Sequence, residues 1–266
     1  MSAATLPHAL TPAAAWQLLA SGNARFVNGT PRHPHHSMWR RRDLAAGQHP
    51  FATVVGCSDS RVSPEIAFDR GLGDVFVVRN AGHVLDDATL GSIEYGVHVA
   101  GTPLLVIMGH EACGCIAATM AAAESGEIPG GYVGSLVRQV LPSVHAASET
   151  GTTCAGEVME EHVRQTVRGL LSRCERIASA VERGDLAIAG VTYRLSDGAV
   201  NLLDWAGNLG RPQAVTPETV NEAERAIVAQ QAAATAVSAA VQTEQAADED
   251  DSETVEAVEA VAATRD

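Results

Sequence analysis

The sequence predicts an α/β fold, in which a mostly parallel β-sheet with one antiparallel edge strand is flanked by helices and preceded by an N-terminal helical arm. Three observations support this prediction. Apolar stretches of strand length alternate with stretches of helical spacing between residues 51 and 193. The stretch 104–108 is apolar at every position, as is typical of a strand buried on both faces of a parallel sheet. Asp197-Gly198 is a hairpin signal, so the last strand should return antiparallel at the edge of the sheet.

The individual elements follow from the same patterns. Strands are predicted over residues 51–56, 75–78, 104–108, 186–193 and 199–204. Helices are predicted over residues 90–100, 111–125, 133–147 and 157–183. In a parallel sheet of this kind, ligands bind beyond the carboxyl ends of the strands. Residues that directly follow a strand are therefore the first candidates for a functional site.

The chain divides into three parts, which are residues 1–50, 51–210 and 211–266. The first part is a helical arm with a connector. Thr11 and Pro12 indicate an N-cap and a first helical residue, and the apolar spacing after them predicts a helix over residues 12–28. Residues 29–50 are rich in proline, histidine and arginine, so we expect an extended connector. The second part carries the predicted sheet.

The third part is an acidic tail rich in alanine and glutamate. It holds twelve acidic residues and three arginines, and so carries most of the net charge of −14. Residues 217–242 are predicted to form a helix, whereas residues 244–266 are too acidic and too poor in large apolar side chains to fold alone. Nucleic acids and anionic membranes repel an acidic protein, so neither is an expected partner.

The sequence also predicts a cytoplasmic protein. No stretch approaches the roughly 20 apolar residues that a membrane-spanning helix needs, and no basic segment followed by an apolar run marks a secretory signal. The chain has five cysteines, an odd number, and only one glycine separates Cys113 from Cys115. This pattern does not suggest a disulfide framework, so a reducing compartment is expected.

Two short motifs follow strands that are distant in the sequence. Cys57 comes directly after the strand predicted at 51–56, and His110 and Cys113 follow the strand predicted at 104–108. Thiolates and an imidazole are ligands that zinc prefers, and a set of three leaves the fourth tetrahedral position open, as in catalytic sites. His110 and Cys113 are three residues apart at the start of a predicted helix, so both side chains can face one ion. The pattern predicts one zinc ion per chain.

Asp59 and Arg61 complete the first motif. They are two residues apart and can form a charge-assisted pair, in which the arginine keeps the carboxylate ionised and away from the metal. The carboxylate can then accept a hydrogen bond from a zinc-bound water, whose pKa zinc lowers from 15.7 to about 7. Taken singly, a buried cysteine usually packs as a small apolar residue and an Asp-x-Arg pair is usually a salt bridge. The combination of both motifs favours a catalytic zinc site.

Together the motifs resemble the signature of the β-class carbonic anhydrases, actinobacterial members above all, over roughly residues 12–210. The matching segments are Cys57-Ser58-Asp59-Ser60-Arg61, Asp69-Arg70-Gly71-Leu72-Gly73-Asp74, Phe76-Val77-Val78-Arg79-Asn80-Ala81-Gly82, Gly91-Ser92-Ile93-Glu94-Tyr95 and Gly109-His110-Glu111-Ala112-Cys113-Gly114. The resemblance implies a Rossmann-like sheet and a homodimer or homotetramer. It also implies that Cys57, His110 and Cys113 hold the zinc beside the catalytic pair.

The resemblance further implies a narrow substrate pocket. Gln48, Phe76 and Tyr95 match pocket residues by position, and in the family some of these side chains reach across the dimer interface. Val62 and Gly114 complete the expected lining. Carbon dioxide is small and nonpolar, so apolar walls suit it. A glutamine amide can donate a hydrogen bond to an oxygen on which negative charge develops.

The expected activity is the reversible hydration of carbon dioxide to bicarbonate and a proton by a zinc-bound hydroxide. Relatives with these motifs also hydrolyse carbon disulfide or carbonyl sulfide, so this reaction stays open as an alternative on the same site. Another alternative is a noncatalytic zinc or redox-sensing protein, with Cys57, Cys113 and Cys115 as sensor thiols. The intact Asp59–Arg61 pair disfavours it, because a structural site does not need a carboxylate that orients water.

Overall fold

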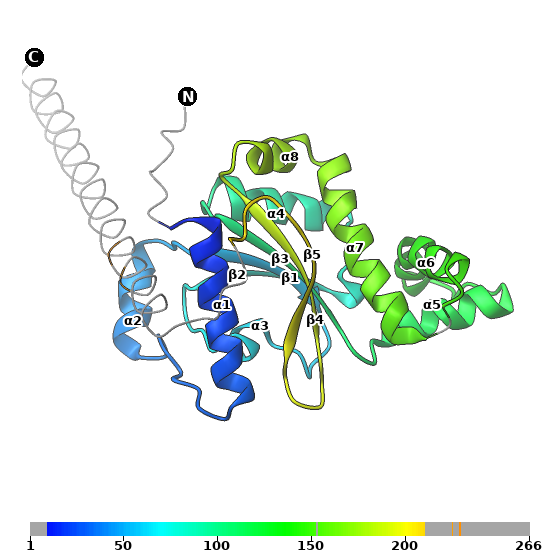
Figure 1. Ribbon diagram of the computed structural model, residues 1–266, viewed down its shortest axis with the longest axis horizontal. Helices are drawn as coiled ribbons and strands as arrows, with labels where there is room; N and C mark the ends of the chain where they lie inside the picture. The colour runs from blue at the N-terminus through cyan, green and yellow to red at the C-terminus, as the bar shows by residue number, and fades with distance from the viewer. Residues whose placement is uncertain (1–9, 153, 211–224, 226–228, 230–266) are drawn as a thin grey trace, which may run out of the picture.

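The computed structural model describes residues 10–152 and 154–210, together with Arg225 and Ala229 (Figure 1). Apart from these two residues, the tail lies outside the described residues. The helix predicted over residues 217–242 and the absence of folding predicted over residues 244–266 therefore stay predictions.

The described part of the chain contains one five-stranded sheet with the strand order β2-β1-β3-β4-β5. Its strands are β1 (Ala52–Cys57), β2 (Val75–Asn80), β3 (Leu104–His110), β4 (Ala187–Tyr193) and β5 (Val200–Ala206). The first four strands pair in parallel, and β5 pairs with β4 antiparallel, with an irregularity between Gly190 and Val191. The predicted fold class, a mostly parallel sheet with an antiparallel edge strand, is confirmed.

Helices cover both faces of this sheet. They are α1 (Pro12–Val27), α2 (Met38–Asp43), α3 (Pro64–Ala67), α4 (Asp87–His98), α5 (Gly114–Ser125), α6 (Val133–Glu149), α7 (Ala155–Arg173) and α8 (Glu175–Glu182). In Figure 1, α1 lies on the opposite side of the strands from α7, and α5 and α6 extend away from the sheet beyond α7. The predicted start of α1 is confirmed, because Thr11 Oγ1 accepts a hydrogen bond from the backbone N–H of Ala14 at 3.2 Å.

Each face of the sheet has its own apolar core, because successive residues of a strand point to opposite sides. On β3, Leu105 and Ile107 pack with residues of α4 to α8, whereas Leu104, Val106 and Met108 pack with residues of α1. All seven residues of β3 are buried. This burial on both faces explains why the stretch 104–108 is apolar throughout, and it makes β3 a rigid support for the residues at its carboxyl end.

Two expectations about helices differ from the structure. The connector predicted over residues 29–50 contains the short helix α2, which Ser37 caps by accepting from Arg40 N at 3.1 Å. None of the α2 residues is buried, and Trp39 is 70% exposed, so α2 has no apolar face that a sequence pattern could reveal.

The single helix predicted over residues 157–183 is also wrong. Cys174 adopts an extended conformation, with φ −116° and ψ 90°, and separates α7 from α8. Its side chain is buried, and Ile177 and Ala180 on α8 pack into the core. The break therefore turns α8 so that its apolar side meets the core, a tertiary requirement that the mixed charges of this stretch conceal.

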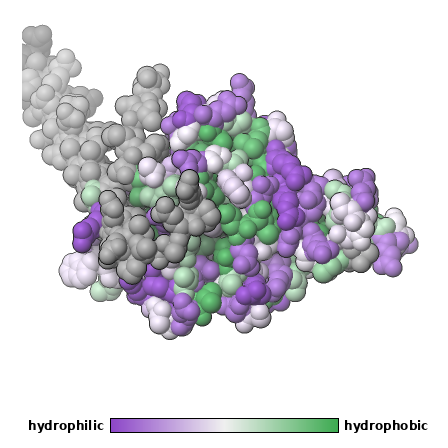
Figure 2. All heavy atoms as spheres, in the orientation of Figure 1, coloured by the Kyte–Doolittle hydropathy of each residue, from purple (hydrophilic) through white to green (hydrophobic). Residues whose placement is uncertain are grey.

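The surface differs between elements. Figure 2 shows hydrophilic side chains over α7 and an apolar area in the middle of the visible face. Among the described residues, no helix combines the length and the apolar character needed to cross a lipid bilayer.

Candidate metal centre

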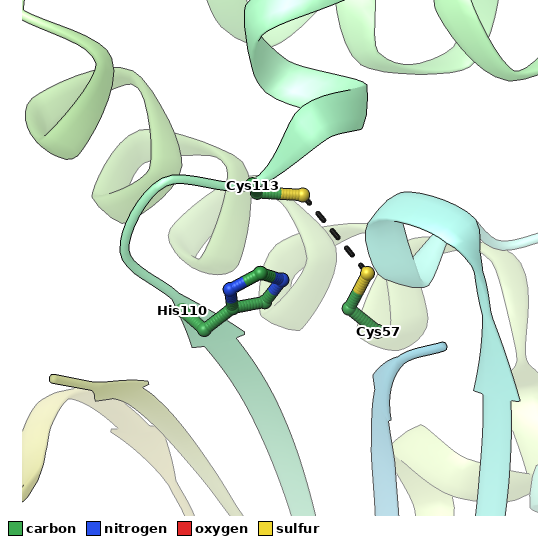
Figure 3. A group of neighbouring side chains, drawn as sticks. All are labelled: Cys57, His110 and Cys113. Atoms are coloured by element: carbon green, nitrogen blue, oxygen red, sulfur yellow. Dashed lines mark hydrogen bonds between the residues drawn. The ribbon is translucent and has the colours of Figure 1, made fainter. Parts of the chain in front are cut away.

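Three side chains converge beyond one edge of the sheet. Cys57 is the last residue of β1, His110 is the last residue of the adjacent strand β3, and Cys113 is the N-cap residue of α5. Their ligand atoms all lie within 4.8 Å of one another, and the two Sγ atoms are 4.0 Å apart. Figure 3 shows the three side chains pointing toward one another. Separate strand ends thus bring together the two sulfurs and one nitrogen that a zinc site of this type requires.

The imidazole of His110 is oriented as in a metal ligand. Its Nδ1 lies 2.8 Å from the backbone oxygen of Glu111, and because a carbonyl oxygen can only accept, Nδ1 carries the proton. Nε2 is then the ring nitrogen that remains for a metal, which binds the imidazole in its neutral form. It is buried and has no hydrogen-bond partner among the described residues. Burying a polar atom without a partner costs free energy of folding. The site therefore fits a zinc ion that binds this nitrogen together with the two sulfurs.

The backbone between His110 and Cys113 is a turn and not the first turn of a helix. The helix predicted to start at residue 111 starts at Gly114, and Ala112 adopts a left-handed conformation with φ 50°. The turn is anchored to the end of β4, because Glu111 N donates to Tyr193 O at 3.1 Å. The predicted helical spacing of His110 and Cys113 was therefore wrong, although the turn directs both side chains to the same point.

The two thiols lie close enough to share a hydrogen bond, with their Sγ atoms 4.0 Å apart. The hydrogen bond from the Cys113 thiol lowers the pKa of Cys57, whereas the same bond, together with burial, raises the pKa of Cys113. Zinc binds thiolates, so its binding releases the protons that the two thiols hold, and metal affinity should rise with pH.

Asp59 and Arg61 form a bidentate ion pair beside the three side chains. Arg61 donates from Nε to Asp59 Oδ1 at 2.9 Å and from Nη2 to Oδ2 at 2.6 Å. These bonds, with the backbone N–H of Arg61, hold the pKa of Asp59 well below its usual range. Arg61 Nη2 also donates to the backbone oxygen of Ala112 at 3.1 Å. The pair thus joins the loop after Cys57 to the turn that carries the other two ligands.

Arg79 is a residue whose contribution no sequence pattern indicated. From β2, its guanidinium donates to three backbone oxygens of the loop after β1, those of Cys57 at 2.9 Å, Asp59 at 2.7 Å and Val62 at 2.8 Å. Charged donors make hydrogen bonds about twice as strong as neutral ones. Arg79 therefore fixes the loop in which both the metal ligand and the carboxylate lie. This contribution could have been foreseen only from the register of β1 and β2, in which Arg79 lies beside Gly56 on the neighbouring strand.

The predicted pocket residues fall into two groups. Val62 is buried in the loop that carries Asp59, and Gly114 directly follows Cys113. Phe76 and Tyr95 stack on each other instead, with ring centroids 5.8 Å apart, and Phe76 lies beside Thr53, four residues before Cys57. Four residues of a strand span about 13 Å, so one chain does not bring this pair to its own metal centre. Gln48 is exposed in the segment before β1.

The sequence and the fold of this chain are similar to those of one family of known proteins. The sequence model of a family described as "Carbonic anhydrase" matches residues 52–200. Carbonic anhydrase 2 of Mycobacterium tuberculosis is 51% identical over 199 residues, which cover 75% of this chain and 96% of that protein. A carbonic anhydrase of Mycolicibacterium smegmatis is 48% identical over 199 residues, covering 75% and 97%. A crystal structure of tetrameric β-carbonic anhydrases from Sordaria macrospora matches with a TM-score of 0.55 and 27% identity, covering 70% of this chain and 94% of that chain.

Proposed function

The chain belongs to the β-class carbonic anhydrases, and we propose that it hydrates carbon dioxide reversibly at one zinc ion held by Cys57, His110 and Cys113. The observation that carries the proposal is the convergence of three buried side chains, because the ligand atoms of Cys57, His110 and Cys113 all lie within 4.8 Å of one another. Three such donors leave one position of a tetrahedral zinc ion open. The proton on Nδ1, bonded to the Glu111 carbonyl, keeps Nε2 available for the metal.

Zinc supplies the acidity in this site, because a metal of this charge lowers the pKa of the water that it binds to near neutrality. The protein then has to orient that water toward carbon dioxide. Asp59 is suited to this task, because its carboxylate stays ionised at neutral pH and can only accept a hydrogen bond. With zinc bound, Asp59 could accept a hydrogen bond from a water at the metal and would so orient that water toward the substrate carbon.

Arg61 positions Asp59 for that role. Its two parallel hydrogen bonds engage both carboxylate oxygens, so the carboxylate cannot rotate freely toward the metal. The Asp59 side chain is 17% exposed and that of Arg61 is 51% exposed, so solvent reaches the pair. Water can therefore replace the bicarbonate product, and the released proton can pass to solvent at this opening.

The substrate pocket is completed by a second copy of the chain in this proposal. Tyr95 is 47% exposed and stacks on Phe76, which lies on the edge strand β2. These aromatic rings, with Val62, offer the apolar walls that a nonpolar substrate needs, and Gln48 offers an amide donor for the developing charge. A homodimer or homotetramer brings the rings of one copy to the metal centre of another. The tetrameric relatives from Sordaria macrospora support this assembly.

Complementation tests the contribution of the second copy. Phe76→Ala keeps the ligands but loses the aromatic wall, whereas Cys57→Ser keeps the wall but loses a ligand. If the wall acts between copies, unfolding and refolding the two inactive variants together restores carbon dioxide hydration in the mixed dimers. Mixtures without activity, in which mass spectrometry shows mixed dimers, would contradict the arrangement.

Hydration of carbon dioxide is favoured over the two alternatives. The relatives compared above are carbonic anhydrases, which supports hydration over hydrolysis of carbon disulfide or carbonyl sulfide. Cys115, one of the possible sensor thiols, does not belong to the ligand cluster. The redox-sensing hypothesis also leaves the ion pair of Asp59 and Arg61 without a role.

Stopped-flow hydration assays with zinc analysis of the same samples test the function. The zinc-loaded protein should hydrate carbon dioxide, and Cys57→Ser should lose both zinc and turnover. Cys154 is exposed and outside the cluster, so Cys154→Ser is the matched control and should keep both. A fully zinc-loaded protein that turns over carbonyl sulfide but not carbon dioxide would replace the proposal by the alternative.

The cytoplasm is the compartment that suits this chemistry. All five cysteines are free, and the two ligand sulfurs lie close to each other. A reducing environment keeps them from forming a disulfide, which would remove two ligands at once.

A further inference from the structure

The thiol of Cys57 receives a hydrogen bond from the backbone. Gly82 N lies 3.4 Å from Cys57 Sγ and donates to it from the Ala81–His83 turn, which follows β2. A donor of this kind withdraws negative charge from a metal-bound thiolate, and so makes the metal a stronger acid. Two thiolate ligands weaken the acidity of zinc, so a bond that reduces their charge matters for a water-activating site.

Two successive residues of this turn adopt left-handed conformations, which are strained only for the second. Gly82 has φ 76°, and the next residue, His83, has φ 41° although it is not a glycine. A methyl group at Gly82 would lie 2.7 Å from Cys115 Sγ, so no larger residue fits. Left-handed conformations of this kind persist only where the surroundings hold them. Some contact must therefore keep the Gly82 N–H directed at the sulfur.

His162 on α7 supplies such a contact. Its Nε2 donates to the backbone oxygen of Gly82 at 2.9 Å, and its Nδ1 lies 2.9 Å from Ser143 Oγ on α6. The side chain is 4% exposed, and its ring packs on that of His83 with centroids 4.5 Å apart. Because both ring nitrogens are engaged in a buried site, the imidazole has one available orientation.

The neighbouring packing brings α7 close enough for this bond. A methyl group at Gly109, the residue before the ligand His110, would lie 2.6 Å from both Met159 Sδ and Val163 Cγ2 of α7. The glycine thus lets α7 contact β3 next to the metal centre, through residues that lie three positions before and one position after His162.

We infer that His162 is a positioning residue for the reaction, which holds the Gly82 N–H on the thiolate of Cys57 and thereby maintains the acidity of the metal. The inference rests on the zinc site proposed above. His162 lies 80 residues from Gly82 along the chain, and it touches neither the substrate pocket residues nor the metal ligands in any of its hydrogen bonds. Among these hydrogen bonds, only the one to Gly82 O leads to a metal ligand, through the turn.

Three variants separate this role from simple packing. In His162→Gln the amide nitrogen can reach the place of Nε2 and donate to Gly82, whereas the shorter amide of His162→Asn can replace only Nδ1. His162→Phe fills the space without donating. We expect zinc affinity to fall about tenfold to a hundredfold in the Phe and Asn variants, the range usual for loss of an outer partner of a metal ligand. The Gln variant should recover most of it.

Cobalt substitution gives a spectroscopic measurement that does not change when only the stability of the fold changes. The thiolate-to-cobalt charge-transfer band in the near ultraviolet depends on the hydrogen bonds to sulfur, so it should shift in the Phe and Asn variants and stay near its wild-type position in Gln. Val167 lies on the same helix and is buried, so Val167→Ala controls for general loss of packing and should leave the band unchanged. Zinc affinities are measured by competition with a chelator.

The outcomes distinguish this inference from the function on which it rests. A His162→Phe protein that has the wild-type cobalt band and zinc affinity overturns the positioning role and leaves the zinc site intact. A band that shifts equally in Val167→Ala also overturns it, because packing then explains the effect. A wild-type protein that takes up neither metal overturns the zinc site itself, and the positioning role with it.

Discussion

The guanidinium of Arg61 binds the carboxylate of Asp59 through two parallel hydrogen bonds and also reaches the backbone oxygen of Ala112. One side chain thus connects the loop after β1 with the turn after β3, the two segments that carry the ligands. The geometry of the water-orienting carboxylate and the geometry of the metal site are therefore linked.

Replacing Arg61 should reduce catalysis without removing the metal. In Arg61→Ala the carboxylate of Asp59 is free to rotate, and we expect kcat/KM for carbon dioxide to fall about tenfold to a hundredfold with zinc content retained. Arg61→Lys should be intermediate, because an ammonium group cannot bind both oxygens in parallel. The measurement is stopped-flow hydration with zinc analysis of each sample.

A matched control exists for that experiment. Arg194 and Asp197 form a similar bidentate pair next to the β4–β5 hairpin, with distances of 2.8 and 2.5 Å. Arg194→Ala should leave kcat/KM unchanged. Equal activity in the Arg61→Ala and Arg194→Ala variants would show that the Asp59–Arg61 pair is only a salt bridge.

Replacing Arg79 should affect stability as well as zinc binding. Arg79→Ala leaves three backbone oxygens of the ligand loop without their charged donor, so the free energy of unfolding of the metal-free protein should fall by about 3 kcal/mol. Arg176 pairs with Glu94 on the surface at 3.5 Å, and Arg176→Ala should cost less than about 1 kcal/mol. Urea titrations of both variants provide the comparison. Equal losses of unfolding free energy would contradict the conclusion that Arg79 fixes the ligand loop.

Asp69 should make the fold sensitive to acid. Burial raises the pKa of Asp69, but the backbone N–H groups of Arg32 and His33 and the guanidinium of Arg25 at 2.6 Å outweigh it and lower the pKa. The unfolded chain then binds more protons than the native one as pH falls. The stabilisation is complete above the unfolded pKa of about 3.9 and is lost as pH decreases through the lower native pKa.

The test compares wild-type and Asp69→Asn proteins, both without metal. The unfolding free energy of the wild type should decrease as pH falls below about 5, and the variant should show a smaller slope and lower stability at pH 7. Urea titrations at several pH values measure both quantities. A variant with the wild-type slope would assign the acid sensitivity to other carboxylates.

Much of the fold could be predicted from the sequence, because burial on both faces of a strand leaves an unambiguous apolar pattern. The stretch 104–108 and the Asp197-Gly198 hairpin are examples, and both agree with the structure. The helix α2 could not be predicted in this way, because it buries no residue. The break at Cys174 also left no local signal, since it depends on how α8 meets the core.

The candidate site also contains residues that could be predicted from the sequence and residues that could not. Cys57, His110 and Cys113 could be predicted because each lies at or just beyond the end of a strand and carries a side chain that binds metals. His162 could not, because its relation to Gly82 arises only when α7 packs on the sheet, 80 residues further along the chain. The separation of Phe76 from Cys57 follows from the strand register, which the sequence pattern does not contain.

Zinc K-edge X-ray absorption of the zinc-loaded protein at alkaline pH shows which atoms bind the metal. We predict two sulfur ligands at about 2.3 Å, one nitrogen at about 2.0–2.1 Å and one light-atom ligand that exchanges with solvent. The Cys57→Ser and Cys113→Ser variants should each lose one sulfur contribution. A wild-type spectrum with four protein ligands, or with fewer than two sulfurs, would contradict the open Cys57–His110–Cys113 site.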